Sequence, residues 1–261
     1  MNQRSRQILL SGNIELIKAH FNQTTVSTIS ILEFVINEKV ECSEKISEIF
    51  HHLVSNGADL HIHDDYLLRL ACRKGLVKIV KFLLDYGLSV HIENEAALYI
   101  ACGEANVVLI KELLLAGATF RKNALYDFCE YLVVLEMILN YGEKSHLHQE
   151  IVEKTLKKLI KKNNVLGVSK ILDSPHINLP ARPWQLFQFA VKNNCNYEML
   201  MVLVSLPPDD TQRINITEED VIRLARDKSD ERIFHLLNDR FKLNINNIDR
   251  KLFIPRYNKY T

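Results

Sequence analysis

Apolar residues recur at helical spacing along most of the chain, in short segments separated by polar turns. Within residues 70–87 they fall three and four positions apart on one helical face, opposite charged side chains. This apolar stripe consists of Leu76, Ile79, Val80, Leu83 and Leu84. Gly87 is expected to end the helix, because glycine enters the left-handed conformation without the steric cost of a Cβ. A shorter helix over residues 66–73, capped by Asp65, is expected before it, so the pattern predicts a helical hairpin.

The predicted hairpin is one copy of a repeated unit. Gly57, Gly87 and Gly117 are separated by 87 − 57 = 30 and 117 − 87 = 30 residues. Three cysteines keep the same interval, namely Cys42, Cys72 and Cys102. A small residue at this position of the first helix lets neighbouring helices approach closely, so we expect these cysteines to be core residues. A fixed period of this length is typical of repeat proteins.

The repeated pattern extends beyond the three copies in which it is clearest. Those three copies cover residues 33–62, 63–92 and 93–120. Degenerate copies are expected over residues 3–32 and 121–250, followed by a C-terminal tail at residues 251–261. No unassigned region is long enough for a separate domain, so residues 1–261 are predicted to form a single solenoid.

Composition narrows the class of protein. An apolar fraction of 47% with 25% charged residues is typical of a folded chain, and the formal charge of +1 supplies no field to hold nucleic acid or a membrane. The apolar run near the N-terminus is interrupted too early for a signal peptide, and no run reaches the roughly 18 apolar residues of a membrane span. Five cysteines, an odd number, favour a reducing compartment. We therefore expect a monomeric, intracellular protein of the cytoplasm or of a host cytoplasm.

Motifs of catalysis or ligand binding are missing from the sequence. There is no Gly-x-Ser-x-Gly, no glycine-rich phosphate loop with a lysine and no His-Glu-x-x-His. His61 and His91 invite a metal-site interpretation, but equivalent positions of stacked repeats lie roughly 8–10 Å apart, too far to share an ion. The lysines of residues 157–162 (KKLIKK) fit a solvated helix face better than a phosphate site. We expect no enzyme, no catalytic residue, no metal and no cofactor.

Residues 70–90, LACRKGLVKIVKFLLDYGLSV, resemble the ankyrin repeat, and NGADLHI at residues 56–62 matches the turn of that family most closely. Two features depart from the family. Its Thr-Pro-Leu-His, whose Thr and His knit the first helix to the turn, is replaced by residues 66–69 (YLLR) and 96–99 (AALY). The period is 30 rather than about 33 residues, with the deletion where the family carries a projecting finger. Such shortened copies are similar to the degenerate ankyrin proteins of large DNA viruses of amoebae and of some intracellular bacteria.

The resemblance implies an all-α, elongated solenoid of stacked helix-turn-helix repeats with shortened finger loops. It also implies a protein-protein interaction module or adaptor whose contacts lie at the loop tips and at the turn after each first helix. These positions are Ser43, Glu44, Asp64, Asp65, Tyr66, Arg73, Lys74, Glu93, Asn94, Glu95, Gly103 and Glu104. The charge at the turn after the first helix alternates from copy to copy, since it is acidic at Ser43 and Glu44, basic at Arg73 and Lys74 and acidic at Gly103 and Glu104. This alternation favours a mixed-charge protein partner, a host protein being one candidate, over nucleic acid or a membrane. The alternative is a structural or virion-associated repeat protein without a regulatory partner.

Overall fold

Every regular element among the described residues is an α-helix. The computed structural model describes residues 3–11, 13–21, 28–38, 45–61, 65–142, 149–177, 183–205, 223–224, 230, 232–233, 235–236 and 239. Within these ranges there is no strand, and no helix is long and apolar enough to cross a bilayer. The chain divides into two compact units, Met1–Arg121 and Lys122–Thr261.

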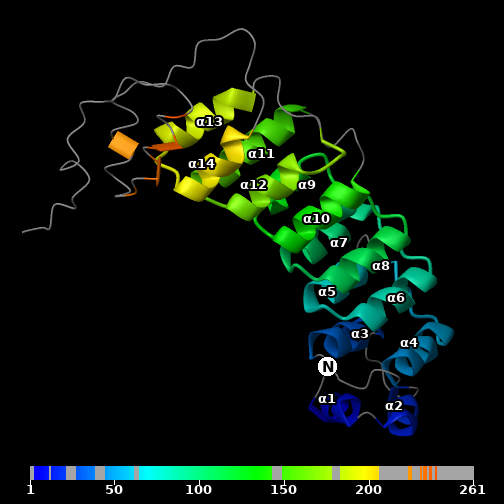
Figure 1. Cartoon of the computed structure of the whole chain (residues 1–261). Coiled ribbons are helices and arrows are strands. Elements are labelled where there is room, and N and C mark those ends of the chain that lie inside the picture. The colour runs from blue at the N-terminus through cyan, green and yellow to red at the C-terminus, as the bar shows by residue number, and fades with distance from the viewer. Residues whose placement is uncertain are drawn as a thin grey trace, which may run out of the picture. The chain divides into compact units, whose positions relative to one another are not determined.

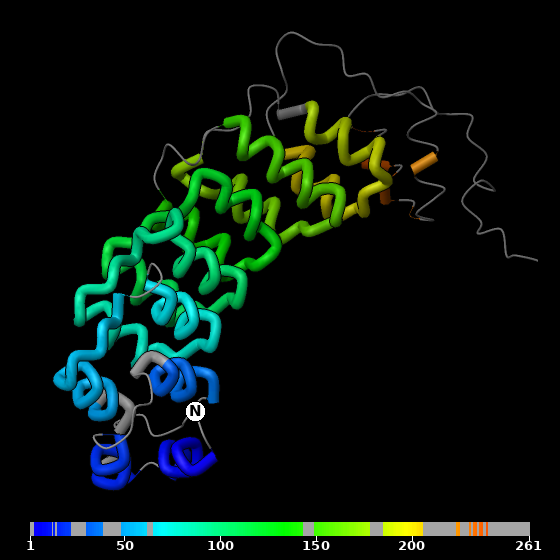
Figure 2. Tube along the Cα trace, turned by 180° about the vertical axis from the view of Figure 1, so that it is seen from behind, coloured from blue at the N-terminus to red at the C-terminus, as the bar shows by residue number. Residues whose placement is uncertain are grey.

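The described part of the first unit contains four helix pairs (Figure 1). They are α1 (Gln3–Leu10) with α2 (Ile14–Phe21), α3 (Thr28–Asn37) with α4 (Lys45–Ser55), α5 (Tyr66–Lys74) with α6 (Val77–Asp85), and α7 (Ile92–Gly103) with α8 (Val107–Leu115). The first helices α3, α5 and α7 pack on one another in order, and so do the second helices α2, α4, α6 and α8. Figure 2 shows the same two-layered succession from behind. The first unit is therefore a stack of helical hairpins, as the period predicts.

The core of this stack consists of the residues that the periodicity selects. In α6 the predicted stripe buries Ile79, Val80 and Leu83, while the residues at its two margins are partly exposed. The helix ends before Gly87, whose φ of +97° lies in the left-handed region, as expected. Cys72 is buried in α5, the helix that packs against the first helices α3 and α7. The hairpin prediction is confirmed in this copy.

The clearest departure from the period lies in the copy assigned to residues 33–62. Its first helix, α3, starts at Thr28, ahead of the predicted boundary, and it buries Val35 and Ile36 at the place that Ala71 and Cys72 take in α5. Cys42 lies outside the described residues. The apolar residues of α3 are not spaced by 30 from those of α5. More residues separate α3 from α4 than separate α5 from α6, so the interval of 30 does not hold for this first helix.

The second unit repeats the same arrangement. Its pairs are α9 (Ala124–Phe128) with α10 (Leu132–Tyr141), α11 (Gln149–Lys161) with α12 (Val165–Leu172), and α13 (Pro183–Lys192) with α14 (Tyr197–Val204). First helices pack on first helices and second on second, as in the first unit. Beyond α14, Leu224 and Ile233 are buried, and Arg232 lies 3.6 Å from Glu198. The last part of the region 121–250, where degenerate copies were expected, falls mostly outside the described residues, and the tail at residues 251–261 lies wholly outside them.

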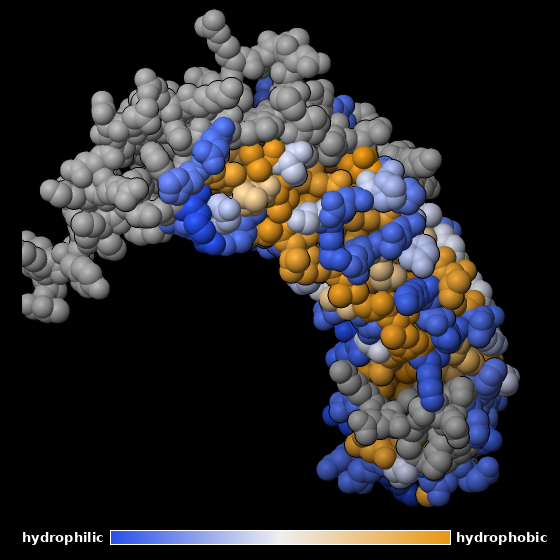
Figure 3. All heavy atoms as spheres, viewed as in Figure 1, coloured by the Kyte–Doolittle hydropathy of each residue, from blue (hydrophilic) through white to orange (hydrophobic). Residues whose placement is uncertain are grey.

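In the view of Figure 3, apolar and charged side chains lie side by side on the coloured surface of each unit. Large apolar side chains that reach solvent include Leu115 at the end of α8 and Leu166 in α12. Single exposed apolar residues of this kind are common on folded proteins.

Burial raises the pKa of two cysteine thiols, and the effect on stability can be measured. Desolvation raises the pKa of Cys72 and of Cys102 from 9.0 to about 12, so folding favours their neutral form. Above pH 9 the unfolded chain gains free energy by ionising these thiols, and stability should fall as the pH rises toward 12. At pH 10 the loss should be about 1.4 kcal/mol for each thiol. Denaturant unfolding at pH 8 and pH 10 measures it, and a variant with both cysteines replaced by alanine should lose correspondingly less.

Candidate interaction surface

A buried carboxylate joins two consecutive turns of the first unit. Asp65 accepts a hydrogen bond from Nδ1 of His61 at 3.0 Å and a second from the backbone N–H of Ser89 at 2.7 Å. Only 4% of Asp65 is exposed. Ser89 belongs to the turn after the next hairpin, so this side chain ties its own turn to the following one.

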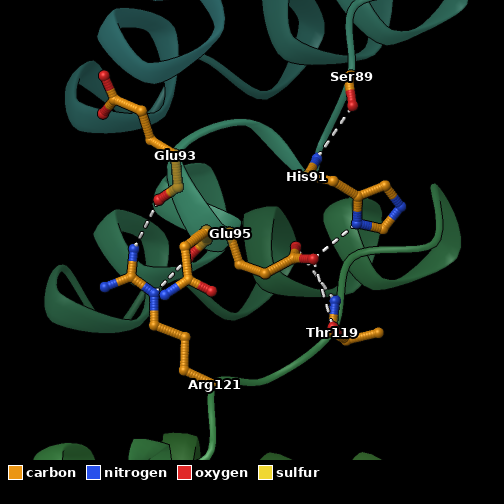
Figure 4. Close-up of polar contacts among 7 residues, drawn as sticks. Ser89, His91, Glu93, Glu95, Thr119 and Arg121 are labelled. Carbon is orange, nitrogen blue, oxygen red and sulfur yellow. Dashed lines mark hydrogen bonds and ion pairs between the residues drawn. The ribbon is translucent and has the colours of Figure 1, made fainter.

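The same bridge recurs one repeat later, at Glu95. Its carboxylate accepts from Nδ1 of His91 at 2.6 Å and from the backbone N–H and hydroxyl of Thr119 at 3.2 and 3.3 Å (Figure 4). Glu95 is 9% exposed. We refer to the contacts of His61, Asp65 and Ser89, and of His91, Glu95 and Thr119, as the two turn bridges. A carboxylate that accepts backbone N–H groups forms charge-assisted hydrogen bonds, which are stronger than neutral ones.

The backbone explains why these carboxylates point into the stack. Asp65 and Glu95 have φ values of +53° and +63°, in the left-handed region. Asp65 takes the N-cap position of α5, but its side chain makes no capping hydrogen bond, so the predicted capping role of Asp65 is wrong. The left-handed conformation redirects the side chain toward the neighbouring turn. The turn bridges thus connect the turns in copies that lack the family's Thr-Pro-Leu-His.

A short left-handed turn precedes the regular part of α7. Glu93, Asn94 and Glu95 all have positive φ, which costs about 1–2 kcal/mol per residue for side chains with a Cβ. Arg121 holds this turn from the following repeat, because its Nη2 donates to the carbonyl of Glu93 at 3.2 Å and its Nε donates to that of Asn94 (Figure 4). From the preceding repeat, Arg69 contacts the Glu93 carboxylate at 2.8 Å. Neighbours on both sides therefore stabilise the strained turn.

Aromatic and basic side chains lie on the neighbouring face of the first helices. The guanidinium of Arg121 stands over the ring of Tyr99 at 4.3 Å from its centroid. In α5, Tyr66 and Arg69 are partly exposed, and Arg73 is exposed near the end of the helix. We call the exposed and partly exposed side chains of α5 and α7, with Glu104 and Arg121, the first-helix face. Arginine and tyrosine are the side chain types that most often dominate protein interfaces.

The ends of α5 and α7 differ in charge. Arg73 and Lys74 stand in the last turn of α5, where a positive charge interacts favourably with the helix dipole. Glu104 stands at the same place after α7, where a negative charge is disfavoured. Local helix energetics account for the basic pair but not for Glu104.

The structure separates the predicted contact residues into three groups. Asp65 and Glu95 are buried in the turn bridges, so they are not available to a partner. The remaining described positions are exposed or partly exposed, and they are Tyr66, Arg73, Lys74, Glu93, Asn94, Gly103 and Glu104. Ser43, Glu44 and Asp64 lie outside the described residues. In α3 the end of the helix that corresponds to Arg73 and Lys74 is Asn37, followed by Glu38.

Arg69, Tyr99 and Arg121, which the fold brings together around Glu93, were not among the residues predicted from the sequence. The turn bridges were not predicted either, although their signal is present. A histidine followed four residues later by an acid recurs at the interval of 30, as His61 with Asp65 and His91 with Glu95.

The two other candidate sites have structural explanations. His61 and His91 bind carboxylates, and no group of three side chains arranged to hold a metal is found within the described ranges. The lysines of residues 157–162 contact other groups of the second unit. These contacts are Lys157 with Glu153 at 2.5 Å, Lys158 and Lys162 with Glu130 at 3.4 and 2.5 Å, and Lys161 with the ring of Phe189 at 5.7 Å. The hydrogen bond from Lys162 lowers the pKa of Glu130.

Comparison with protein families identifies the repeat in the central part of the chain. Residues 40–124 match the family described as ankyrin repeats, in three copies. No curated protein matches the chain. Residues 40–124 are therefore similar to ankyrin repeats, and the all-helical hairpins of the described residues agree with this similarity.

Proposed function

We propose that the chain is a non-catalytic adaptor that binds a protein partner through the first-helix face. Ankyrin repeats are generally protein-protein interaction modules, and residues 40–124 match three copies of this repeat. The observation that supports this location best is the cluster of Arg69, Glu93, Tyr99 and Arg121, which groups side chains typical of interface hot spots on one face.

Rigidity supports the same location. The turn bridge of Glu95 and the contacts of Arg121 fix the turn 93–95 before any partner arrives. A preformed surface loses less conformational entropy on binding, so more of the contact free energy appears as affinity. We infer that the bridges serve recognition as well as stability.

Source and partner follow from resemblance alone. We propose that the chain comes from a large DNA virus of amoebae, that it acts as a monomer in the cytoplasm, and that its partner is a host protein. The alternative is a structural or virion-associated repeat protein, for which self-association or capsid components would be the only partners.

Charge reversal at the exposed basic pair tests the location. Arg73→Glu with Lys74→Glu should weaken capture of the partner by about tenfold or more, because a positively charged part of the face becomes negative. Circular dichroism should show that the helices remain folded, since Arg73 is exposed, Lys74 is partly exposed, and the unfavourable interaction of two glutamates with the helix dipole is small.

The matched control reverses two lysines on the second helices, Lys78→Glu with Lys111→Glu, both exposed in the same unit. This control should leave capture unchanged. Equal loss from both pairs would show a nonspecific charge effect and contradict the location. Recovery of only the chain itself or capsid components would favour the structural alternative.

A further inference from the structure

We propose that the partner segment recognised by the first-helix face is acidic, and that Glu93 occupies the place of a partner carboxylate until that segment binds. This inference rests on the proposed function, because it names the class of partner for the same surface. It replaces a mixed-charge partner by a segment rich in Asp and Glu.

Three pairs of residues at equivalent positions, which we call steps, lie along the neighbouring helices α5 and α7. Residues 30 apart take equivalent places on α5 and α7, which pack on each other. The steps pair Tyr66 with Ala96, Arg69 with Tyr99, and Arg73 with Gly103. At the first and third steps α7 contributes a residue with little or no side chain beside a large one from α5. A bound segment can therefore approach α7 closely while it contacts the tyrosine and arginine side chains.

The charge of this face is positive among its exposed and partly exposed described residues. Its cations are Arg69, Arg73, Lys74 and Arg121, and its anions are Glu93 and Glu104. The carboxylates of Asp65 and Glu95 are buried and hydrogen-bonded within the turns. Glu33 on the neighbouring helix α3, and Glu38 directly after that helix, limit the positive region. An acidic segment is thus favoured over α5 and α7 and disfavoured over α3.

The ion pair of Arg69 with Glu93 shows how a carboxylate is held on this face. The Arg69 side chain is 16% exposed, whereas that of Glu93 is 55% exposed. An ion pair with an exposed carboxylate is weak, because water screens the two charges and ordering both side chains costs entropy, so Glu93 leaves at low cost. Arg69 is better shielded from water, and its planar guanidinium can bind an incoming carboxylate through two hydrogen bonds. Glu93 is therefore an exchangeable occupant.

Breaking the ion pair between Glu93 and Arg69 would leave the backbone conformation of the turn 93–95 unchanged. Arg121 binds the backbone carbonyls of Glu93 and Asn94, and Glu95 holds the amide of Thr119. In Figure 4 the carboxylate of Glu93 points away from Arg121 while its carbonyl points toward it. The side chain can rotate outward while the backbone stays fixed, so exchange requires no refolding.

A displayed library of random peptides selected on the full-length protein tests the proposal. Peptides that depend on the first-helix face are those that lose binding to Tyr99→Ala, and we expect these to be enriched in Asp and Glu. A fluorescently labelled peptide from this set should bind about tenfold more weakly to Arg73→Glu and about fivefold more tightly to Glu93→Gln. Its affinity should also fall with added salt.

The possible results distinguish the acidic-partner inference from the proposed function. Face-dependent peptides without enrichment in acidic residues, or unchanged or weaker binding to Glu93→Gln, would overturn the acidic-partner inference and leave the proposed function standing. Enriched peptides that bind Tyr99→Ala and Arg73→Glu as well as the parent chain, or no enriched peptide at all, would overturn both. The Lys78→Glu, Lys111→Glu variant serves as the control for general charge effects.

Discussion

Replacing Glu95 with alanine should lower the free energy of unfolding by about 2–4 kcal/mol. The substitution removes a buried carboxylate that accepts hydrogen bonds from His91 and from the amide and hydroxyl of Thr119. The amide of Thr119 then loses its partner within the stack, and the left-handed conformation of residue 95 loses the contact that compensates for its strain. Urea denaturation followed by circular dichroism measures the change.

Glu93→Ala is the matched control in the same turn. Glu93 is also glutamate with a positive φ, but its carboxylate is exposed, and Arg121 contacts its backbone carbonyl rather than its side chain. Its replacement should cost less than about 1 kcal/mol. If both substitutions cost the same, the turn bridge contributes nothing specific to stability.

Replacing Leu113 with alanine should destabilise the first unit by about 3 kcal/mol, since it removes a side chain with no exposure and leaves a cavity in the stack. Leu115, two residues further along α8, is 83% exposed, and Leu115→Ala should change stability by less than about 0.5 kcal/mol. The two variants share residue type, helix and chemical change. Their denaturation midpoints therefore test which face of α8 is buried, and a larger effect at Leu115 would contradict the packing.

The hairpins were predictable because their determinants are local. An apolar residue every three to four positions selects the buried face of α6, and a glycine in the left-handed region ends each copy, as at Gly57, Gly87 and Gly117. Packing of helix on helix then follows, because one hairpin has too little apolar surface to fold alone.

The contacts of the polar side chains in the turns could not be predicted from local sequence in the same way. The sequence places Asp65 immediately before a helix, where capping is the usual role of aspartate. The structure gives Asp65 a left-handed backbone instead, and its carboxylate binds Ser89, distant in the chain but adjacent in the stack. A residue other than glycine rarely adopts this conformation, so sequence pattern alone does not indicate it.

The copy at residues 33–62 shows a second limit of prediction from the sequence. A strict interval of 30 assigns the turn after the first helix to Ser43 and Glu44, whereas α3 ends at Asn37, followed by Glu38. The positions of its own apolar residues, rather than the spacing of glycines and cysteines, determine where α3 lies. Positions deduced by counting from one copy to the next are reliable only where both helices keep the same interval, as α5 and α7 do.

The turn bridges and the first-helix face are parts of one arrangement. Glu95 anchors the turn from which Glu93 and Asn94 project, and Arg121 joins the same turn to Tyr99. Recognition should therefore be sensitive to the bridges, because loss of Glu95 loosens the backbone that presents these groups. Any loss of binding in Glu95→Ala is expected to accompany its loss of stability.

Site-specific photocrosslinking tests the central claim, that the first-helix face binds a protein partner, most directly. A photoreactive benzoylphenylalanine replaces either Arg73 on α5 or Lys111 on α8, both exposed residues of the first unit, and the chain is irradiated in the cells that naturally contain it. We predict a discrete crosslinked protein from position 73 and none from position 111. Crosslinks from position 111 alone, or the same products from both positions, would contradict the assignment of the first-helix face.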